Sequence, residues 1–513
     1  MPATLIVSFL EATFVVFVLS HILQWSTQKA AEPPVVENAY PFIGPIIQML
    51  RCKSQFHLRT SKKYRLPTHT LRLPGIRIYV LNKLSLITAA QKQHHVLSFG
   101  PIMGQAIGKI AGTSNAANEN MTKDVLTDNG FLLGFNKTIY PTMAPGPSLD
   151  ALTRRAASTF VDLIDRLKEN DATSYQVSLS AWTRSTILRG TTDAVYGDAN
   201  PFRDPSVEAA WYAFEPGVTA LAMKFIPSFV TSKTRQARDI LVQSFIKYFS
   251  VGCPKKASQF MKARYDHIIR HQVTSVQDIA KLEVAGAFSI ITNSTPTAFW
   301  LLYHIFSDQA ALEDCRLELS ALVQERDGVC YLDIESIKAS CPTICSIFHE
   351  VMRYYGVAQS MRAVLEDHML DNAHLLRKGS MLMMPATVQH FDPSVWGSDV
   401  NHFNYKRFIK STSDKAGHNF DSKLGNNGAF RGFGGGLHLC PGRHFAINEI
   451  ISFAALMVLR FDIVPAGDGS WPVIRTDSLS SKGSAIIMPD HDLEVILCPR
   501  ENRKWAICSK ISR

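Results

Sequence analysis

The chain has 513 residues, of which 46% are hydrophobic and 19% are charged, a balance that permits a large core and excludes a disordered protein. Its 54 basic and 44 acidic residues give a formal net charge of +10, but the basic residues are scattered rather than clustered. A nucleic-acid partner is therefore not expected, whereas an anionic membrane face or an acidic protein partner explains the excess. Nine cysteines without CxxC pairs predict reduced thiols in a cytosol-facing protein.

An apolar stretch from Leu5 to Leu23 opens the chain, and it approaches the roughly 20 residues that a helix needs to cross a bilayer. Glu11 is costly in that setting. A cleaved signal peptide or a buried helix would also be apolar, but a charged leader and a small-residue cleavage site are both missing. Because basic residues follow the stretch, we expect residues 1–28 to form a single anchor with the rest of the chain in the cytosol.

Proline and glycine concentrate after this stretch, at Pro33-Pro34 and from Pro41 to Pro45. The composition predicts a stiff, non-helical hinge over residues 29–50, although a surface loop would read the same way. The main domain would then occupy residues 51–513.

Strand patterns are few in this long domain. Thr68–Leu81 alternates around Pro74-Gly75 and predicts a β-hairpin, and Ser484–Met488 with Leu493–Leu497 predicts a final one. Residues 148–340 carry mainly helical patterns. The expected fold is therefore mainly α with small β-sheets.

A long apolar segment from Glu283 to Ile305 has the length of a buried helix, interrupted by the polar run Thr292–Thr295 and by Pro296. A proline inside a helix removes a hydrogen bond and opens the preceding turn. The polar side chains either face a ligand at this opening or bond back to carbonyls of their own helix.

The stretch Phe433–Gly442 holds three consecutive glycines, then Cys440, Pro441 and an apolar helical segment from Arg443 to Leu459. Glycines allow turns that residues with a Cβ resist. A thiolate at a helix N-terminus is favoured by backbone N–H groups and binds soft metals. The plainer reading is a buried free cysteine.

This stretch resembles the haem-binding loop of the cytochrome P450 family, Phe-Gly-x-Gly-x-(basic)-x-Cys-x-Gly. The matching residues are Phe433, Gly434, Gly436, His438, Cys440 and Gly442. Two more family motifs precede it in the expected order, Glu350-x-x-Arg353 and Arg407-Phe408. The resemblance implies that residues 51–513 form a haem-thiolate catalytic domain. Its fold would be the haem-thiolate fold, with haem b as cofactor and Cys440 as the axial ligand of the iron.

The resemblance also implies roles for several basic residues. Glu350, Arg353 and Arg407 would lock the scaffold behind the haem loop, although an isolated Glu–Arg pair on a helix surface means little. Arg362, on a predicted strand, and His438 would face haem propionates; a solvated His438 is equally open. The family's Trp-x-x-x-Arg motif is missing, and no choice is made among Lys123, Lys137, Arg154 and Arg155.

In the family, the segment around Thr292 would be the helix that crosses the distal face of the haem. Counting back from Trp300 puts Asn293 at the usual Thr position and Thr292 at the usual acid position, so Asn293 and Thr295 are the catalytic candidates. An Asn followed by Pro and Phe-Trp is similar to the branch that contains cholesterol 7α-hydroxylase, sterol 12α-hydroxylase and prostacyclin synthase. That branch includes both oxygen-inserting enzymes and an isomerase.

The expected function is a monooxygenase at the endoplasmic reticulum membrane that oxidises a hydrophobic polycyclic substrate such as a sterol, terpenoid or related secondary metabolite. Dioxygen and NADPH-derived electrons from a cytochrome reductase would be consumed. The alternatives are a haem-thiolate isomerase or dehydratase that needs no reductant, and a non-enzymatic haem-binding protein. The polar run Thr292–Thr295 argues against the last. No obligate oligomer is implied.

Overall fold

The computed structural model describes residues 2–508 except 37–39, 128, 168–172, 224–225, 411–418, 422–423, 425–426, 477–482 and 502. The chain divides into two compact units, each assembled from three separate segments. The sheet unit comprises Met1–Ile102, Val357–Asn401 and Gly428–Leu439. The helical unit comprises Met103–Gly356, His402–Asn427 and Cys440–Arg513. Both units contribute to the predicted catalytic domain.

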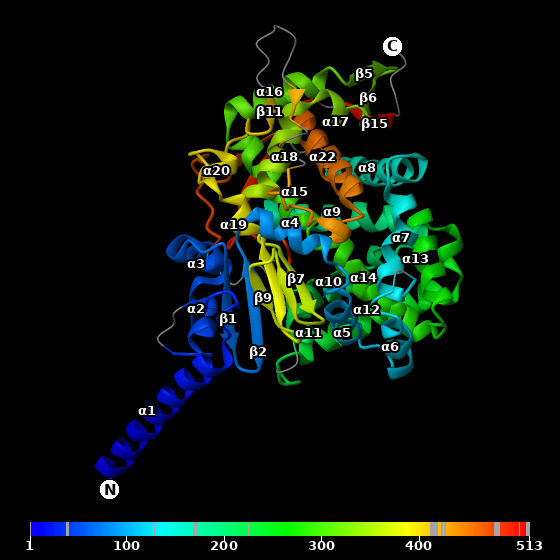
Figure 1. Cartoon of the computed structure of the whole chain (residues 1–513). Coiled ribbons are helices and arrows are strands. Elements are labelled where there is room, and N and C mark those ends of the chain that lie inside the picture. Colours follow the sequence, from blue (N-terminus) through cyan, green and yellow to red (C-terminus); the bar gives the residue numbers. More distant parts are fainter. Residues whose placement is uncertain are drawn as a thin grey trace. The chain divides into compact units, whose positions relative to one another are not determined.

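A five-stranded sheet with strand order β1-β2-β10-β7-β3 organises the sheet unit (Figure 1). The strands are β1 (Thr68–Leu73), β2 (Ile76–Leu81), β10 (Met381–Pro385), β7 (Gln359–Val364) and β3 (Leu97–Ser98). β1 and β2 pair antiparallel, Thr68 opposite Leu81, with Gly75 at φ +69° in the turn, so the predicted first hairpin is confirmed. β10 joins β2 in parallel and β7 antiparallel.

Alternating side chains give this sheet two apolar faces. Tyr79, Leu81 and Leu382 belong to one buried cluster, whereas Ile78 and Val80 belong to the other. The remaining elements of the unit are α2 (Gly44–Cys52), η1 (Lys53–Gln55), α3 (Phe56–Tyr64), α4 (Leu84–Lys92), β8 (His368–Leu370), β9 (His374–Leu376), α19 (Ala386–His390), α20 (Pro393–Trp396) and η7 (Gly436–His438). α2 corrects the prediction of a non-helical hinge, because the segment is helical from residue 44; Pro45 stands at the helix start, where its missing N–H costs nothing.

Helix α1 (Pro2–Thr27) projects away from the sheet of its own unit (Figure 1). Its C-terminal end is held by two arginines of the first hairpin. Arg72 donates to Thr27 Oγ1 at 2.7 Å, and Arg77 donates to the Thr27 carbonyl at 2.9 Å. The side chain of Glu32 is fully buried, accepts from Tyr79 Oη at 2.7 Å and lies 3.2 Å from Arg77 Nε.

The residues after Glu32 continue this attachment along the free edge of β1. Val35 forms a parallel bridge with Thr70, and Thr70 Oγ1 donates to the Pro33 carbonyl at 2.6 Å. A covered edge strand is protected from pairing with other chains. Segment 28–36 is therefore docked on the sheet rather than extended away from it. No helix is long and apolar enough to span a membrane within the residues that the structure describes.

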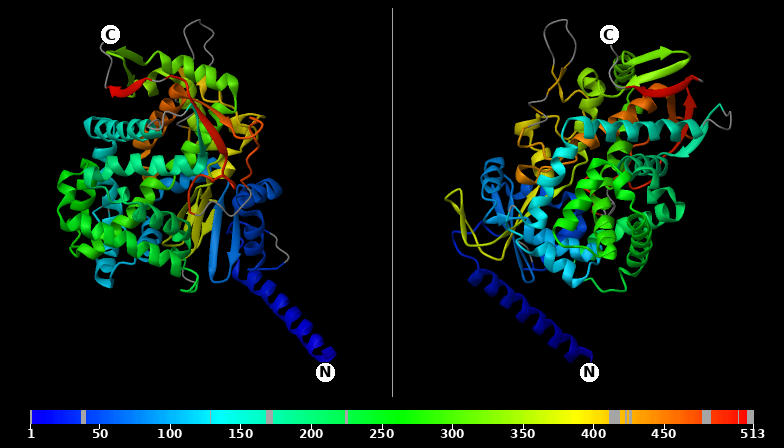
Figure 2. Two further views of the ribbon diagram at one scale, coloured as in Figure 1. Left: turned by 180° about the vertical axis from the view of Figure 1, so that it is seen from behind. Right: turned by 90° about the vertical axis from the view of Figure 1, so that its right-hand side faces the viewer.

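Helices dominate the helical unit, which confirms the mainly α prediction (Figures 1 and 2). They are α5 (Gly100–Ala111, which begins in the sheet unit), α6 (Asn115–Thr122), α7 (Phe131–Met143), α8 (Pro147–Leu167), α9 (Leu179–Tyr196), α10 (Pro205–Phe214), α11 (Val218–Ala222), α12 (Ser232–Ser250), α13 (Gln259–Arg270), α14 (Val276–Ile291), α15 (Ser294–Phe306), α16 (Gln309–Ser320), α17 (Ile337–Ser340), α18 (Pro342–Tyr354) and α22 (Arg443–Arg460). α22 packs against α8, α15, α16 and α18, and its residues from Ile450 to Leu459 are all buried.

Short sheets complete this unit. They are β13-β14-β4 (Phe461–Pro465, Glu494–Pro499, Tyr175–Ser178), β15-β6-β5 (Lys504–Cys508, Val329–Asp333, Val323–Arg326) and β11-β12 (Ile409–Lys410, Asn419–Phe420). The predicted final hairpin is wrong. Ser484–Met488 forms only an isolated bridge, between Ile486 and Gly356, while β14 pairs with β13 and β4.

Candidate functional site

Cys440 stands directly before helix α22, as the sequence predicts. Gly442 occupies the N-cap position, and the Arg443 guanidinium donates to the Cys440 carbonyl at 3.1 Å. Burial raises the pKa of the Cys440 thiol, whereas the backbone N–H groups of Gly442 and Arg443 and the charge of Arg443 lower it. The N–H groups and the helix dipole are arranged to stabilise a thiolate once a cation replaces its proton.

The glycines before Cys440 are required by backbone geometry in the sheet unit. Gly434 and Gly436 have φ of +80° and +63°, a region that other residues resist. A Cβ on Gly435 would lie 2.9 Å from the Gln91 side chain. The backbone conformation at Gly434 and Gly436 therefore disfavours any other residue, and a side chain at Gly435 would have to displace the end of the Gln91 side chain. The half-buried Phe433 stands at the start of this loop.

Glu350, Arg353 and Arg407 meet in the helical unit and form one hydrogen-bonded cluster. Both Glu350 oxygens accept from Arg353 at 2.7 Å and from Arg407 Nε at 3.1 Å. The Asn404 backbone N–H donates to Glu350 at 3.0 Å, and the His402 carbonyl accepts from Arg407 at 3.2 Å. The side chains of Glu350 and Arg353 are fully buried. Segment 402–407 is thereby fixed to α18 by paired charges.

The predicted long helix is broken, which corrects the expectation of one continuous element. α14 ends at Ile291, α15 begins at Ser294, and Pro296 has no N–H to continue the ladder. Thr297 Oγ1 donates to the Asn293 carbonyl at 2.7 Å. This is the side-chain bond to a carbonyl of the same helix that the second interpretation of the sequence predicts. The Thr292 hydroxyl, in contrast, is buried and finds no partner among the described residues.

Asn293 and Thr295, the predicted catalytic residues, have different surroundings. Asn293 Oδ1 accepts from the Ala485 backbone N–H at 2.7 Å, while Thr295 is buried in the first turn of α15. The chain around Ala485 is held a second time, because Trp300 Nε1 donates to the Ile487 carbonyl at 2.7 Å. The segment that was predicted as a strand is therefore docked beside the helix break, held by Asn293, by Trp300 and by the bridge between Ile486 and Gly356.

The same region contains residues that sequence reasoning missed. Ser289 is exposed on the otherwise mostly buried α14, one turn before Asn293. Gly483 has φ +91°, and a Cβ there would lie 2.6 Å from Thr219 Oγ1 and 3.2 Å from Phe288. The backbone at Gly483, helix α11 at Thr219 and helix α14 at Phe288 thus converge beside the helix break. Only Gly483 could have indicated this close approach in the sequence, because a backbone that passes near other elements often requires a glycine.

Arg362 and His438, predicted to face an anion, both lie in the sheet unit. Phe99 separates them, with its ring 5.8 Å from the Arg362 guanidinium and 5.3 Å from the His438 ring. Burial, with the charge of Arg362 and the proximity of His94, lowers the pKa of His438 to about 4. His438 is therefore uncharged at neutral pH.

Two of the four basic residues that the sequence left open as propionate partners have carboxylate partners in the structure. Arg154 pairs with Glu335 at 2.9 Å, and Arg155 pairs with Asp198. Both guanidinium groups are therefore engaged by carboxylates of the helical unit. The sequence pointed to neither pairing, because the partners are distant along the chain.

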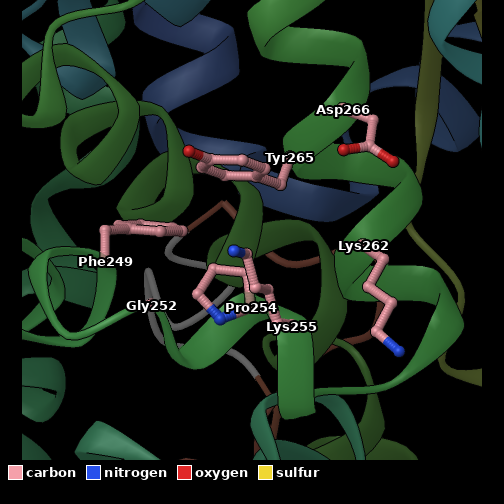
Figure 3. A pocket seen from close by; sticks show the side chains of 7 residues that line it. All are labelled: Phe249, Gly252, Pro254, Lys255, Lys262, Tyr265 and Asp266. Atoms are coloured by element: carbon pink, nitrogen blue, oxygen red, sulfur yellow. The ribbon is translucent and has the colours of Figure 1, made fainter.

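A pocket of about 350 Å³ lies in the helical unit, apart from all predicted site residues (Figure 3). It is lined by Phe249, Gly252, Pro254, Lys255, Lys262, Tyr265 and Asp266. The rings of Phe249 and Tyr265 stack on each other at 5.7 Å rather than standing apart to receive a third ring. This pocket contains neither a cysteine nor any of the predicted site residues, so it is not the candidate site.

The residues present fit a haem. In the helical unit, Cys440 supplies a soft ligand at a helix N-terminus. In the sheet unit, the preceding loop carries no side chains at Gly434–Gly436, and Arg362 is a buried cation. The described part of the chain offers no cluster of three His, Cys, Asp or Glu that would hold a different metal. The free cysteines are Cys52, Cys315, Cys330, Cys341, Cys345, Cys440, Cys498 and Cys508.

Comparison with known proteins identifies the class. The cytochrome P450 family model matches residues 277–488, which include the Glu350 cluster, the helix break and Cys440. Cytochrome P450 monooxygenase nodJ of Hypoxylon pulicicidum is 28% identical over 92% of this chain and 91% of its own length. A cytochrome P450 monooxygenase of Gibberella zeae is 27% identical over 91% and 88%. The chain therefore carries a cytochrome P450 domain and is a haem-thiolate oxidoreductase of the monooxygenase class.

The chain also resembles one particular branch of that family. Cholesterol 7-alpha-monooxygenase of Cricetulus griseus is 22% identical over 85% of this chain and 88% of its own length. The branch that the Asn293 pattern predicted is thus represented among its relatives.

Proposed function

We propose that the protein is a membrane-bound monooxygenase that oxidises a hydrophobic polycyclic substrate, such as a sterol, a terpenoid or a related secondary metabolite. Dioxygen and two electrons from NADPH, delivered by a cytochrome reductase, are the co-substrates. The observation that carries the proposal is Cys440 at the N-terminus of the buried helix α22, directly after a loop in which Gly434 and Gly436 have positive φ. The similarity to a cholesterol monooxygenase supports the substrate class.

The haem, when bound through its thiolate ligand, supplies the power to activate dioxygen for attack on an unactivated C–H bond. The chain's own residues do the rest. Cys440 would hold the iron, and the Glu350–Arg353–Arg407 cluster fixes segment 402–407 to α18. Asn293 fixes the Ala485 segment beside the helix break, where we place the substrate.

Membrane attachment through α1 is part of this proposal. α1 exposes large apolar side chains, among them Phe14, Val16 and Leu19. A lipid surface is the partner that such an exposed row fits, since water contact with large apolar side chains is unfavourable. We place the catalytic residues on the cytosolic side of the endoplasmic reticulum membrane, where the reductase and NADPH are available.

A haem-thiolate isomerase or dehydratase is the second candidate, and the distal helix favours keeping it. α14 and α15 carry no acid after Glu283. Glu283 itself is fully buried and engaged by Arg264 and by the Tyr196 hydroxyl. The helix break thus offers hydroxyls and an amide, which position water, but no carboxyl to deliver protons during dioxygen activation.

Isotopically labelled dioxygen separates the two candidates. Membranes containing the protein are incubated with a lipid extract of the host, with and without NADPH and reductase, and products are followed by mass. A labelled product that requires NADPH supports the monooxygenase. An unlabelled product that forms equally without NADPH supports the isomerase. The same incubations compare Cys440→Ser, which removes the proposed iron ligand, with Cys498→Ser, a matched control at a half-buried cysteine outside the motif.

A further inference from the structure

Arg431 is buried in the sheet unit, with 3% of its surface exposed, and its guanidinium meets only neutral groups. Its Nη2 lies 3.5 Å from Ser360 Oγ, and the Gln91 amide, turned so that its oxygen faces the guanidinium, accepts at 3.3 Å. Its Nε has no partner among the described residues. The backbone is fixed separately, because the Arg431 N–H donates to His390 Nε2 at 2.9 Å.

Arg362, on β7, is a second buried cation in the same region. It has 5% of its surface exposed, and burial together with the charge of Arg431 lowers its pKa to about 10. Neither guanidinium forms an ion pair with a described carboxylate. Buried arginines of the helical unit differ in this respect, since each faces an acid: Arg353 with Glu350, Arg264 with Glu283, and Arg460 with Asp165.

Two like charges that repel each other in a buried place are unfavourable unless an anion compensates them. Arginine cannot relieve the cost by losing its proton at physiological pH, as a histidine or a carboxyl can. The planar forks of two arginines match the geometry of carboxylates.

We propose that Arg431 and Arg362 form a carboxylate-binding site, and that Arg431 is a haem-propionate ligand in place of the Trp-x-x-x-Arg motif that this sequence lacks. The inference rests on the proposed haem-thiolate function. A substrate carboxylate has the same chemistry as a propionate, so the test must distinguish the two sources.

Haem dimethyl ester, in which both propionates are esterified, provides that test. The full-length protein is reconstituted with haem or with the diester, and the rate of transfer to an excess of a haem-scavenging protein is measured. The proteins compared are the native sequence, Arg431→Gln and Arg431→Lys. Arg154→Gln, at an arginine that already has a carboxylate partner, is the matched control.

We expect Arg431→Gln to lose haem about 10- to 100-fold faster than the native protein, the range for one charge-assisted hydrogen bond. Its loss of the diester should change little, because the propionate charge is already gone. Arg431→Lys should lie between, since it restores the charge without the fork. Arg154→Gln should match the native protein with both cofactors.

Two outcomes would overturn the proposal. Equal acceleration for haem and diester in Arg431→Gln would show that Arg431 serves only the packing of its loop. Unchanged rates with both cofactors would assign the two cations to another carboxylate, such as that of a substrate. Either result leaves the function proposed above standing, whereas absence of a thiolate-bound haem in the native protein would remove both.

Discussion

Two arginine clusters in this protein show opposite ways of burying charge. In the helical unit, Arg353 and Arg407 share the carboxylate of Glu350, so every charge has a partner supplied by the chain. In the sheet unit, Arg362 and Arg431 have no described acid to compensate them. A cluster that is complete in itself belongs to the scaffold, whereas an incomplete one indicates a ligand that brings the missing charge.

Glu449 is the mirror case, a buried acid without a cation. Its only hydrogen-bond partner among the described residues is the Thr191 hydroxyl, and burial raises its pKa to about 8. A carboxyl can neutralise itself by keeping a proton, and the arginines cannot. The Glu350 cluster, the Arg362–Arg431 pair and Glu449 therefore differ in how their charge is compensated, and substitutions at each should have different effects.

The largest effect is expected from Glu350→Gln, which leaves two buried guanidinium groups without their carboxylate. The stability should fall by about 3–5 kcal/mol, the usual cost of breaking a buried pair. Denaturant unfolding of the full-length holoenzyme measures it. Glu335→Gln, which removes an exposed ion pair with Arg154, should cost no more than about 1 kcal/mol. Equal effects would remove the distinction between scaffold cluster and surface pair.

Glu32→Gln should release the segment that joins α1 to the first hairpin, because a buried carboxylate bonded to Tyr79 and Arg77 is replaced by an amide. Opening of segment 28–36 should become easier by about 1.5–3 kcal/mol. Trypsin cleavage after the exposed Lys29, followed by mass, should accelerate accordingly, while Glu11→Gln in the exposed part of α1 should have no effect. An unchanged rate would mean that the backbone bonds to β1 hold the segment alone.

Glu449 predicts a pH dependence. The folded chain keeps a proton, up to a pKa of about 8, that the unfolded chain releases at its ordinary 4.5. Stability should therefore fall as pH rises through this window, by at most about 1.4 kcal/mol per pH unit. Urea unfolding of Glu449→Gln, which is neutral throughout, should show a flatter profile. A profile as steep as the native one would exclude Glu449 as its source.

Asn293→Ala tests a neutral contact and should have the smallest effect on stability, about 0.5–1.5 kcal/mol for one hydrogen bond to the Ala485 N–H. Because the Ala485 segment would shift, the distribution of products should change more than the stability. Asn293→Asp keeps the acceptor and should restore the stability in thermal unfolding. If the Asn293→Asp and Asn293→Ala variants are equally destabilised, the hydrogen bond to Ala485 contributes nothing to the stability.

Local signals account for what the sequence predicted well. The glycines before Cys440, the three-residue spacing of Glu350 and Arg353, and the turn of the first hairpin depend on neighbours in the chain. The break at Thr292–Asn293 followed from Pro296, although the sequence did not show that α14 and α15 are separate helices.

Tertiary pairing accounts for the rest. The predicted final hairpin failed because β14 finds its partners in β13 and β4, and β4 lies near residue 177. Arg431 carried no signal, since its significance depends on a carboxylate that is missing from its surroundings in space. The absence of a counter-charge is a property of the fold and not of any motif.

The central claim, that Cys440 is the axial ligand, is tested most directly by the absorption spectrum of the reduced protein with carbon monoxide. The native protein and Cys498→Ser should show the red-shifted Soret band of a thiolate-bound haem. Cys440→Ser should lose that band, even where haem remains bound. If Cys440→Ser retained it, the ligand would be another residue, and the account of the site would be wrong.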